Sequence, residues 1–173
     1  MGYNQGITAG EIKTVVRRLN KLDEREIPGR SNIAKEMGPG EFSGRSYELK
    51  VADDIGLDNI RRVSKEVGGA GAIGELDIIR KSGRVIEVTE SFSSSKRSVF
   101  NKIQNKLEAM RAYDGVALDG NTLTIRAKEI INIEQIKDVI KNWEDTVRTS
   151  DDWGNADINI RLIDDDGNII AGS

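Results

Sequence analysis

Two acidic residues fall opposite each other across a short hairpin near the middle of the sequence. Two apolar segments of strand-like composition flank a three-residue loop, residues 81–83, which ends in Gly. Pairing Arg80 with Arg84 across this loop places Asp77 directly opposite Glu87. Like charges in such positions repel each other, and a divalent cation would reverse the sign of that interaction. We therefore expect Asp77 and Glu87 to bind a metal ion.

A third carboxylate, Glu48, lies in a helix predicted over residues 44–56. The positions one and two turns along the helix from it are apolar: Val51, Ala52 and Ile55. Glu48 therefore points with the apolar face toward the core. A buried, unpaired carboxylate is unfavourable, so Glu48 either reaches the rim, pairs with a nearby Arg, or joins the other two acids at a metal.

The hairpin acids also have a purely structural interpretation, as members of weak surface ion pairs with Arg80 or Arg84. The residues around them argue against it, because they form near-continuous apolar runs: Leu76, Ile78, Val85, Ile86 and Val88. Such runs are typical of strands that are buried on both faces. We therefore expect Asp77 and Glu87 to lie in or beside the core.

The composition excludes several kinds of chemistry. The 173 residues include no His and no Cys, which excludes serine–histidine triads, histidine-dependent nucleases, zinc ribbons and thiol nucleophiles. Carboxylates, Lys, hydroxyl groups and a metal remain. No apolar run approaches the roughly 20 residues that span a bilayer, so we expect no membrane partner for the folded domain.

The net charge of −3 is unusual for a protein that binds nucleic acid. The distribution of charge matters more than the total. Basic residues gather beside the three acids: Lys81, Arg84, Lys96, Arg97, Lys102 and Lys106. A basic rim next to an acidic metal site is what the cleavage of a phosphodiester requires.

The surrounding elements predict an α/β fold with a mixed central sheet and helices on both faces. A helix is predicted over residues 8–22 and a weakly patterned linker over 28–40, so we expect a helical N-terminal arm and linker at 1–43 and an α/β domain at 44–173. A short strand is predicted near residues 60–63. The three Ser residues at 93–95 supply cap residues for a helix that extends to about residue 113.

The C-terminal part predicts a second hairpin, a helix and a final pair of strands. Residues 116–118 and 123–125 flank Asp119-Gly120-Asn121, a typical hairpin turn. An amphipathic helix is expected around residues 136–147. A strand at residues 158–162 is followed by a turn at 166–168 and a short return strand.

A helix with Glu48, followed by a hairpin with Asp77 and Glu87 and then an amphipathic helix, resembles the PD-(D/E)xK, or restriction-endonuclease-like, nucleases over residues 44 to 126. The resemblance implies a restriction-endonuclease-like mixed central sheet flanked by helices, here with an extra C-terminal helix and hairpin. It also implies that Asp77, Glu87 and Glu48 ligate Mg²⁺, Mn²⁺ or Zn²⁺, or that Glu48 orients the attacking water.

The departure from this family is Thr89, which stands where the motif usually has Lys. In some members of the fold the lysine comes from a neighbouring element. Lys96 and Lys102 on the following helix are the candidates here, with Thr89 positioning water or phosphate. The alternative is a non-catalytic domain of the same fold that binds nucleic acid or protein, its chemistry lost with the lysine.

A glycine-rich run that leads into residues 75–79, followed by Val85-Ile86-Glu87-Val88, is similar to the C-terminal toxin domains of contact-dependent growth inhibition and related polymorphic toxin systems. This similarity implies a metal-dependent endonuclease that cleaves DNA or tRNA. It also implies delivery by secretion or from a cell surface, action in the cytoplasm of the target cell, and a cognate immunity protein as partner.

Overall fold

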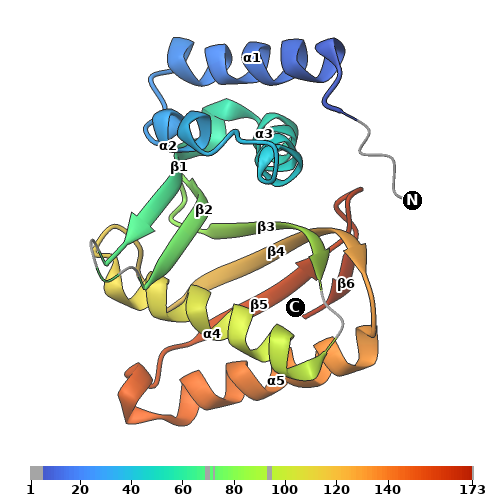
Figure 1. Cartoon of the computed structure of the whole chain (residues 1–173). Helices are drawn as coiled ribbons and strands as arrows, with labels where there is room; N and C mark the ends of the chain where they lie inside the picture. The colour runs from blue at the N-terminus through green and yellow to red at the C-terminus, as the bar shows by residue number, and fades with distance from the viewer. Residues whose placement is uncertain (1–5, 69–70, 72, 93–94, 173) are drawn as a thin grey trace.

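The computed structural model describes residues 6–68, 71, 73–92 and 95–172, and in this part of the chain six strands form one mixed sheet. The strands lie in the sheet in chain order (Figure 1): β1 Ile60–Val67, β2 Gly74–Arg80, β3 Val85–Phe92, β4 Asn121–Ile130, β5 Ile158–Ile163 and β6 Ile169–Ala171. The pairs β1/β2, β2/β3 and β5/β6 are antiparallel, whereas β4 runs parallel to both β3 and β5.

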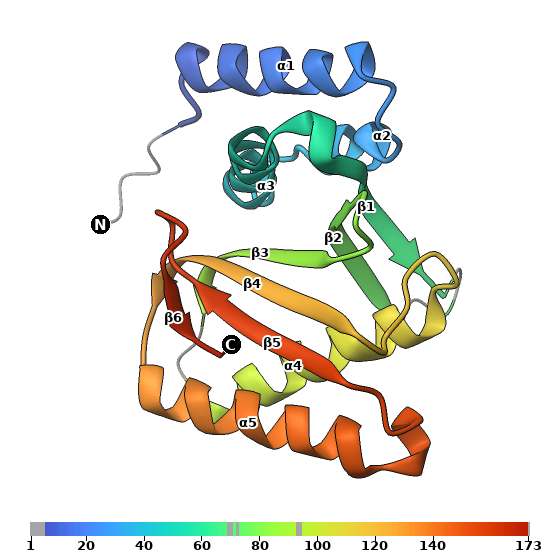
Figure 2. The same ribbon diagram turned by 180° about the vertical axis from the view of Figure 1, so that it is seen from behind.

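Helices cover both faces of this sheet (Figures 1 and 2): α1 Ala9–Glu24, α2 Arg30–Lys35, α3 Phe42–Ile55, α4 Lys96–Ala112 and α5 Ile133–Thr149. α4 and α5 pack on one face, where Ile103, Leu107 and Trp143 belong to the larger apolar cluster. The three N-terminal helices pack on the other face around a second cluster. The mixed α/β architecture expected from the sequence is confirmed.

The helices predicted from apolar periodicity are present. α1, α3, α4 and α5 contain the four predicted segments, with ends that differ by a few residues. The α4 N-terminus is capped by Ser95, whose Oγ accepts a hydrogen bond from the Ser98 backbone N at 3.2 Å. Ser93 and Ser94 of the predicted cap lie outside the described residues, as do positions 69, 70 and 72 of the glycine-rich run.

The predicted hairpin around residues 119–121 is wrong. Residues 123–125 belong to β4, whose two edges are taken by β3 and β5, and residues 116–118 precede it in a turn. The turn is held by the chain before β5: Gly120 N donates to Asp157 O at 2.7 Å, and Asp157 N donates to Asp119 Oδ1 at 2.7 Å. β4 therefore pairs with a parallel strand on each side, and residues 116–118 do not form the antiparallel hairpin strand that was predicted.

The N-terminal segment packs into the core of the protein. Val15, Leu19 and Leu22 of α1 and Ile33 of α2 are buried in the cluster that also contains Tyr47 of α3. This cluster spans the expected boundary at residue 43. Residues 9–35 therefore hold α3, and with it Glu48, against the sheet.

Replacing Leu22 by Ala should destabilise the protein by about 2–5 kcal/mol, because this side chain is fully buried and its loss leaves a cavity. Ile12→Ala on the same helix is the matched control, since Ile12 is 49% exposed, and should change stability by less than about 0.5 kcal/mol. Urea unfolding of both variants checks this expectation. Equal stabilities would show that α1 is not part of the cooperative core.

Candidate functional site

The β2–β3 hairpin has the register that places Asp77 opposite Glu87. Arg80 N donates to Arg84 O at 2.9 Å, and the strand pairing continues through Ile79 with Val85 and Ile78 with Ile86. The loop closes at Gly83, whose φ of 85° lies in the left-handed region that Gly adopts without strain. The turn therefore fixes the register expected from the sequence.

The backbone pairing of β2 with β3 stops just before the two acids. Beyond Ile78 and Ile86 the Asp77 side chain takes over, and its Oδ2 accepts a hydrogen bond from Val88 N at 2.8 Å. β3 continues instead in parallel pairing with β4. The divergence of the two strands opens a place for polar side chains, and the bond to Val88 fixes the Asp77 carboxylate there.

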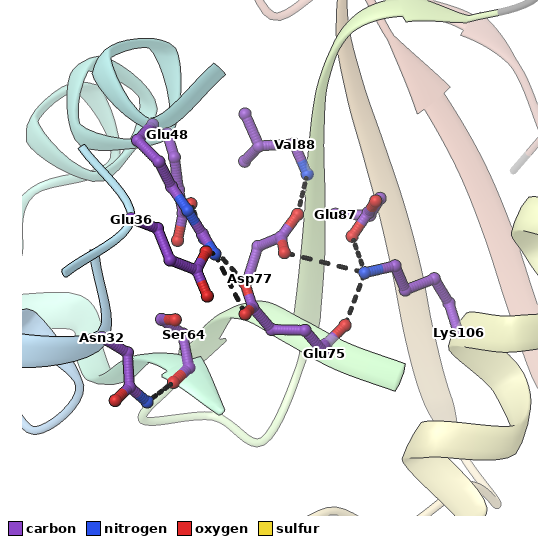
Figure 3. A network of polar contacts seen from close by, with 10 residues as sticks. Asn32, Glu36, Glu48, Ser64, Glu75, Asp77, Glu87, Val88 and Lys106 are labelled. Atoms are coloured by element: carbon purple, nitrogen blue, oxygen red, sulfur yellow. Dashed lines mark hydrogen bonds and ion pairs between the residues drawn. The ribbon is translucent and has the colours of Figure 1, made fainter. Parts of the chain in front are cut away.

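A largely buried lysine from α4, whose side chain is 15% exposed, lies between the two hairpin acids (Figure 3). Lys106 Nζ is 2.6 Å from Glu87 Oε2 and 3.6 Å from Asp77 Oδ1, and it also donates to the backbone oxygen of Glu75. Neither arginine of the hairpin forms an ion pair with these acids in the described structure. The weak surface pairing considered from the sequence is therefore replaced by a buried ion-pair cluster.

The lysines expected at the site lie elsewhere on α4. Lys102 Nζ is 3.5 Å from Thr89 Oγ1 and 3.4 Å from Ser91 O, at the edge of the acidic cluster. Lys96 is the first residue of α4 and is exposed. Thr89 itself lines the same cleft as the acids. The structure thus brings Lys106, one turn beyond Lys102, to the carboxylates.

Glu48 reaches the same cleft from α3 and is only 4% exposed. Its Oε2 is 2.7 Å from Arg45 Nη1, which is also 2.7 Å from Glu75 Oε1. Arg45 Nη2 pairs with Glu36 as well. Glu48 Oε1 has no hydrogen-bond partner among the described residues. Glu48 therefore pairs with a nearby Arg and still presents one free, buried oxygen.

Three carboxylates come close enough together to share one cation. Single oxygen atoms of Glu48, Glu75 and Asp77 lie within 4.8 Å of one another. Figure 3 shows these three side chains side by side. Oxygen ligands of this kind suit hard divalent cations. Asp77 belongs to this group and also contacts Lys106, which pairs with Glu87. Asp77 therefore links the group of three carboxylates to Glu87.

The cleft around these side chains has a volume of about 570 Å³ and an excess of acid. Six carboxylates and two cations line it: Glu41, Glu48, Glu75, Asp77, Glu87 and Glu90, with Arg45 and Lys106. A phosphate group would be repelled by this set of charges alone. The cleft can therefore accept a phosphodiester only after further positive charge has entered.

The acids differ in how readily they ionise. Burial and the charge of Asp77 raise the pKa of Glu48 to about 8, against the effect of Arg45. The same two causes raise the pKa of Glu87 well above its usual value. Burial also opposes ionisation of Asp77, yet the Lys106 charge and the Val88 hydrogen bond lower its pKa overall. The site therefore favours the ionised form of Asp77 and the protonated form of Glu87.

Lys106 remains charged in this setting. Burial acts to lower its pKa, but the charges of Asp77 and Glu87 outweigh burial and raise that pKa above the usual value for Lys. A lysine with a raised pKa cannot accept a proton at neutral pH. Lys106 therefore supplies fixed positive charge at the site.

The sequence analysis missed Arg45 and Glu75, and it named Lys106 only as part of the basic rim. Simple periodicities point to the first two, because Arg45 is one turn before Glu48 on the same helix and Glu75 is two positions before Asp77 on the same strand. Lys106 stands between Asn105 and the buried Leu107. Only the docking of α4 beside β2 shows that it points to the acids.

Comparison of the chain with models of protein families, with curated proteins and with solved structures found no match. Within the described residues, no helix combines the length and the apolar character that crossing a membrane requires. The functional argument therefore depends on the geometry of the cleft.

We expect the metal-free protein to lose stability as the pH rises from about 4.5 to about 8. A carboxyl whose pKa is higher in the folded chain binds a proton on folding, so the free energy of unfolding falls between the two pKa values. For Glu48 this window runs from 4.5 to about 8, and Glu87 acts in the same direction. Urea unfolding in the presence of a chelator measures the effect.

The Glu48→Gln variant is the control for this pH dependence, because Gln has no proton to lose. Its free energy of unfolding should change less across the same window. Wild-type stability that increases from pH 5.5 to pH 8 would contradict the assigned protonation of the two glutamates.

Proposed function

We propose that the protein is a metal-dependent endonuclease of the restriction-endonuclease-like class that hydrolyses phosphodiester bonds in DNA or tRNA. The observation that carries the proposal is the placement of Asp77 and Glu87 side by side at a divergence of two strands, with Lys106 between them and Glu48 facing them. The order of elements from α3 to β4, with three antiparallel strands and then a parallel one, supports the same class.

Carboxylate oxygens suit a divalent cation such as Mg²⁺, Mn²⁺ or Zn²⁺, and those of Glu48, Glu75 and Asp77 lie close enough to share one. Asp77 and Glu87 would hold it, with Glu48 as a ligand or as the group that orients water. The free Oε1 of Glu48 is a buried acceptor that awaits a partner. When bound, the ion lowers the pKa of a water molecule and neutralises charge on the phosphate. The excess of carboxylates over cations in the cleft supports this assignment, because a divalent cation would reduce the repulsion among them.

Glu48 and Lys106 would have two different roles in the reaction. Glu48 lines the cleft with one carboxylate oxygen that has no hydrogen-bond partner among the described residues, so in its ionised form it would orient the attacking water and accept its proton. Lys106 keeps its proton and stabilises negative charge as it develops on the phosphate. Lys106 thereby takes the role of the lysine that the motif usually has at position 89. Thr89, whose hydroxyl contacts Ser91 O and Lys102, would position water or phosphate.

The biological setting proposed is that of a toxin domain in competition between bacteria. It would be secreted or delivered from a cell surface, act in the cytoplasm of the target cell, and be blocked by a cognate immunity protein. The support is the similarity of the glycine-rich run and of the β2 and β3 sequences to such toxin domains. The chain has no His and no Cys, so a nuclease of this kind would depend on its carboxylates and a metal.

One observation favours a non-catalytic interaction domain as the second candidate. Arg45 and Lys106 together neutralise the buried acids from within the chain. An acidic cluster with internal cations can be a purely structural feature. The two candidates differ in whether a divalent ion enters the cleft.

We expect Asp77→Asn and Glu87→Gln each to abolish cleavage of plasmid DNA or total tRNA and to weaken binding of Mn²⁺ in calorimetry. Each change keeps the side-chain size while removing a ligand charge. Asp119→Asn, in the exposed turn before β4, is the matched control and should cleave as the wild type does. A cell that expresses the wild-type domain without an immunity protein should stop growing.

Two outcomes would contradict the nuclease proposal. The first is equal Mn²⁺ binding by the wild type and by the Asp77→Asn/Glu87→Gln double variant. The second is normal growth, with intact DNA and RNA, of cells in which folded wild-type domain is confirmed. The interaction domain would then be the better account.

Lys106→Ala should lower the turnover number by on the order of 10²-fold, the usual scale for one preorganised electrostatic contact. Lys96→Ala should retain activity, because Lys96 is exposed at the start of α4. Lys102→Ala, which removes a contact to Thr89, should have a smaller effect than Lys106→Ala. Single-turnover cleavage measures the chemical step directly. A fully active Lys106→Ala variant would show that its charge serves folding alone.

A further inference from the structure

A polar groove on the exposed side of α4 lies next to the acidic cleft. It is lined by Ser95, Arg97, Ser98, Asn101, Lys102 and Asn105. None of these side chains is acidic, although the whole protein has a net charge of −3. Ser98, Asn101, Lys102 and Asn105 recur at helical spacing and so share one face of α4. The groove therefore presents two cations among neutral hydrogen-bonding groups.

The two cations of this groove are available to a ligand. Arg97 and Lys102 are exposed, and neither forms an ion pair with a carboxylate in the part of the chain that the structure describes. Other cations near the acidic cleft are neutralised: Arg45 by Glu48 and Glu75, and Lys106 by the hairpin acids. An anion would therefore find free positive charge in this groove.

The groove joins the acidic cleft at Lys102. Its Nζ lies 3.5 Å from Thr89 Oγ1 and 3.4 Å from Ser91 O, and both of these residues line the acidic cleft. Lys106 is one turn further along α4 and lies inside that cleft. Ser98, Lys102 and Lys106 thus follow one another at steps of about 6 Å along the helix.

We propose that the α4 groove binds the sugar–phosphate backbone of a short single strand of nucleic acid and leads it into the acidic cleft. A duplex that is bound through about 6–10 phosphate contacts needs a comparable number of cations. Two unpaired cations can neutralise far fewer phosphates, so the occupant is a short, single-stranded segment. Asn101 and Asn105 add donors and acceptors for sugar or base edges. This inference rests on the proposed nuclease function.

Binding is tested on the metal-free protein in a chelator, so that no cleavage interferes. Fluorescence anisotropy compares labelled single strands of RNA and of DNA, on the order of ten nucleotides long, with a duplex of equal length. The Arg97→Ala/Lys102→Ala variant should bind the single strands about tenfold more weakly than the wild type. The slope of log affinity against log salt should become shallower by about 1.4, the value for two lost contacts.

The matched control is Lys13→Ala/Arg17→Ala, which removes the same charge from exposed positions of α1, on the other side of the sheet from α4. It should bind within about twofold of the wild type. The tighter of the RNA and DNA strands identifies the substrate class. The inference is overturned by equal losses in both double variants, by no loss in either, or by a duplex that binds more tightly than the single strands.

Cleavage in the presence of Mn²⁺ separates this inference from the nuclease proposal. A wild type that binds as expected and does not cleave would refute the nuclease and leave the groove as a binding site. A wild type that cleaves, with unchanged strand binding after loss of Arg97 and Lys102, would refute the groove and leave the nuclease.

Discussion

The repulsion between two buried carboxylates governs the organisation of this protein. Asp77 and Glu87 face each other where β2 and β3 separate. Water screens their charges only weakly, because both side chains are largely buried. Lys106 offsets the repulsion with an ammonium 2.6 Å from Glu87, and burial together with the charge of Asp77 raises the pKa of Glu87. Every element near the site helps to place one of these charges.

The fold brings these charges together from both faces of the sheet. α4 carries Lys106 on the face that contains the larger apolar cluster, and α3 carries Glu48 and Arg45 on the other face. Side chains from both layers meet where the two strands diverge. The helices α1 and α2 contribute no charge here, but they hold α3 against the sheet.

Arg45 and Lys106 also explain how the cleft remains folded without a metal. An unpaired buried charge is strongly destabilising, whereas a well-paired one has a net effect on stability that is close to zero. In our account a divalent ion takes over part of this neutralisation and leaves Lys106 to act on the phosphate. A raised pKa at Glu48 then links metal binding to the loss of a proton.

Local rules were sufficient for the parts of the site that are fixed by local geometry. The loop length and Gly83 determined the register that pairs Asp77 with Glu87, and helical periodicity placed Glu48 on a buried face. The sequence could not show that β4 lies between two parallel strands. The dipeptide Asp119-Gly120 is equally compatible with a hairpin turn and with a loop that leads into a parallel strand. Nor could it choose Lys106 over Lys102, since that depends on how α4 docks on the sheet.

The central claim is that the buried acids of the cleft bind a divalent ion, and a crystal structure of the protein with Mn²⁺ tests it most directly. The account predicts an anomalous scattering peak within bonding distance of a carboxylate oxygen of Asp77 and of at least one oxygen of Glu87 or Glu48. It also predicts that Lys106 Nζ will have moved away from Glu87. Crystals grown at high Mn²⁺ concentration that show no peak at these carboxylates, with Lys106 and Arg45 still paired to them, would contradict it.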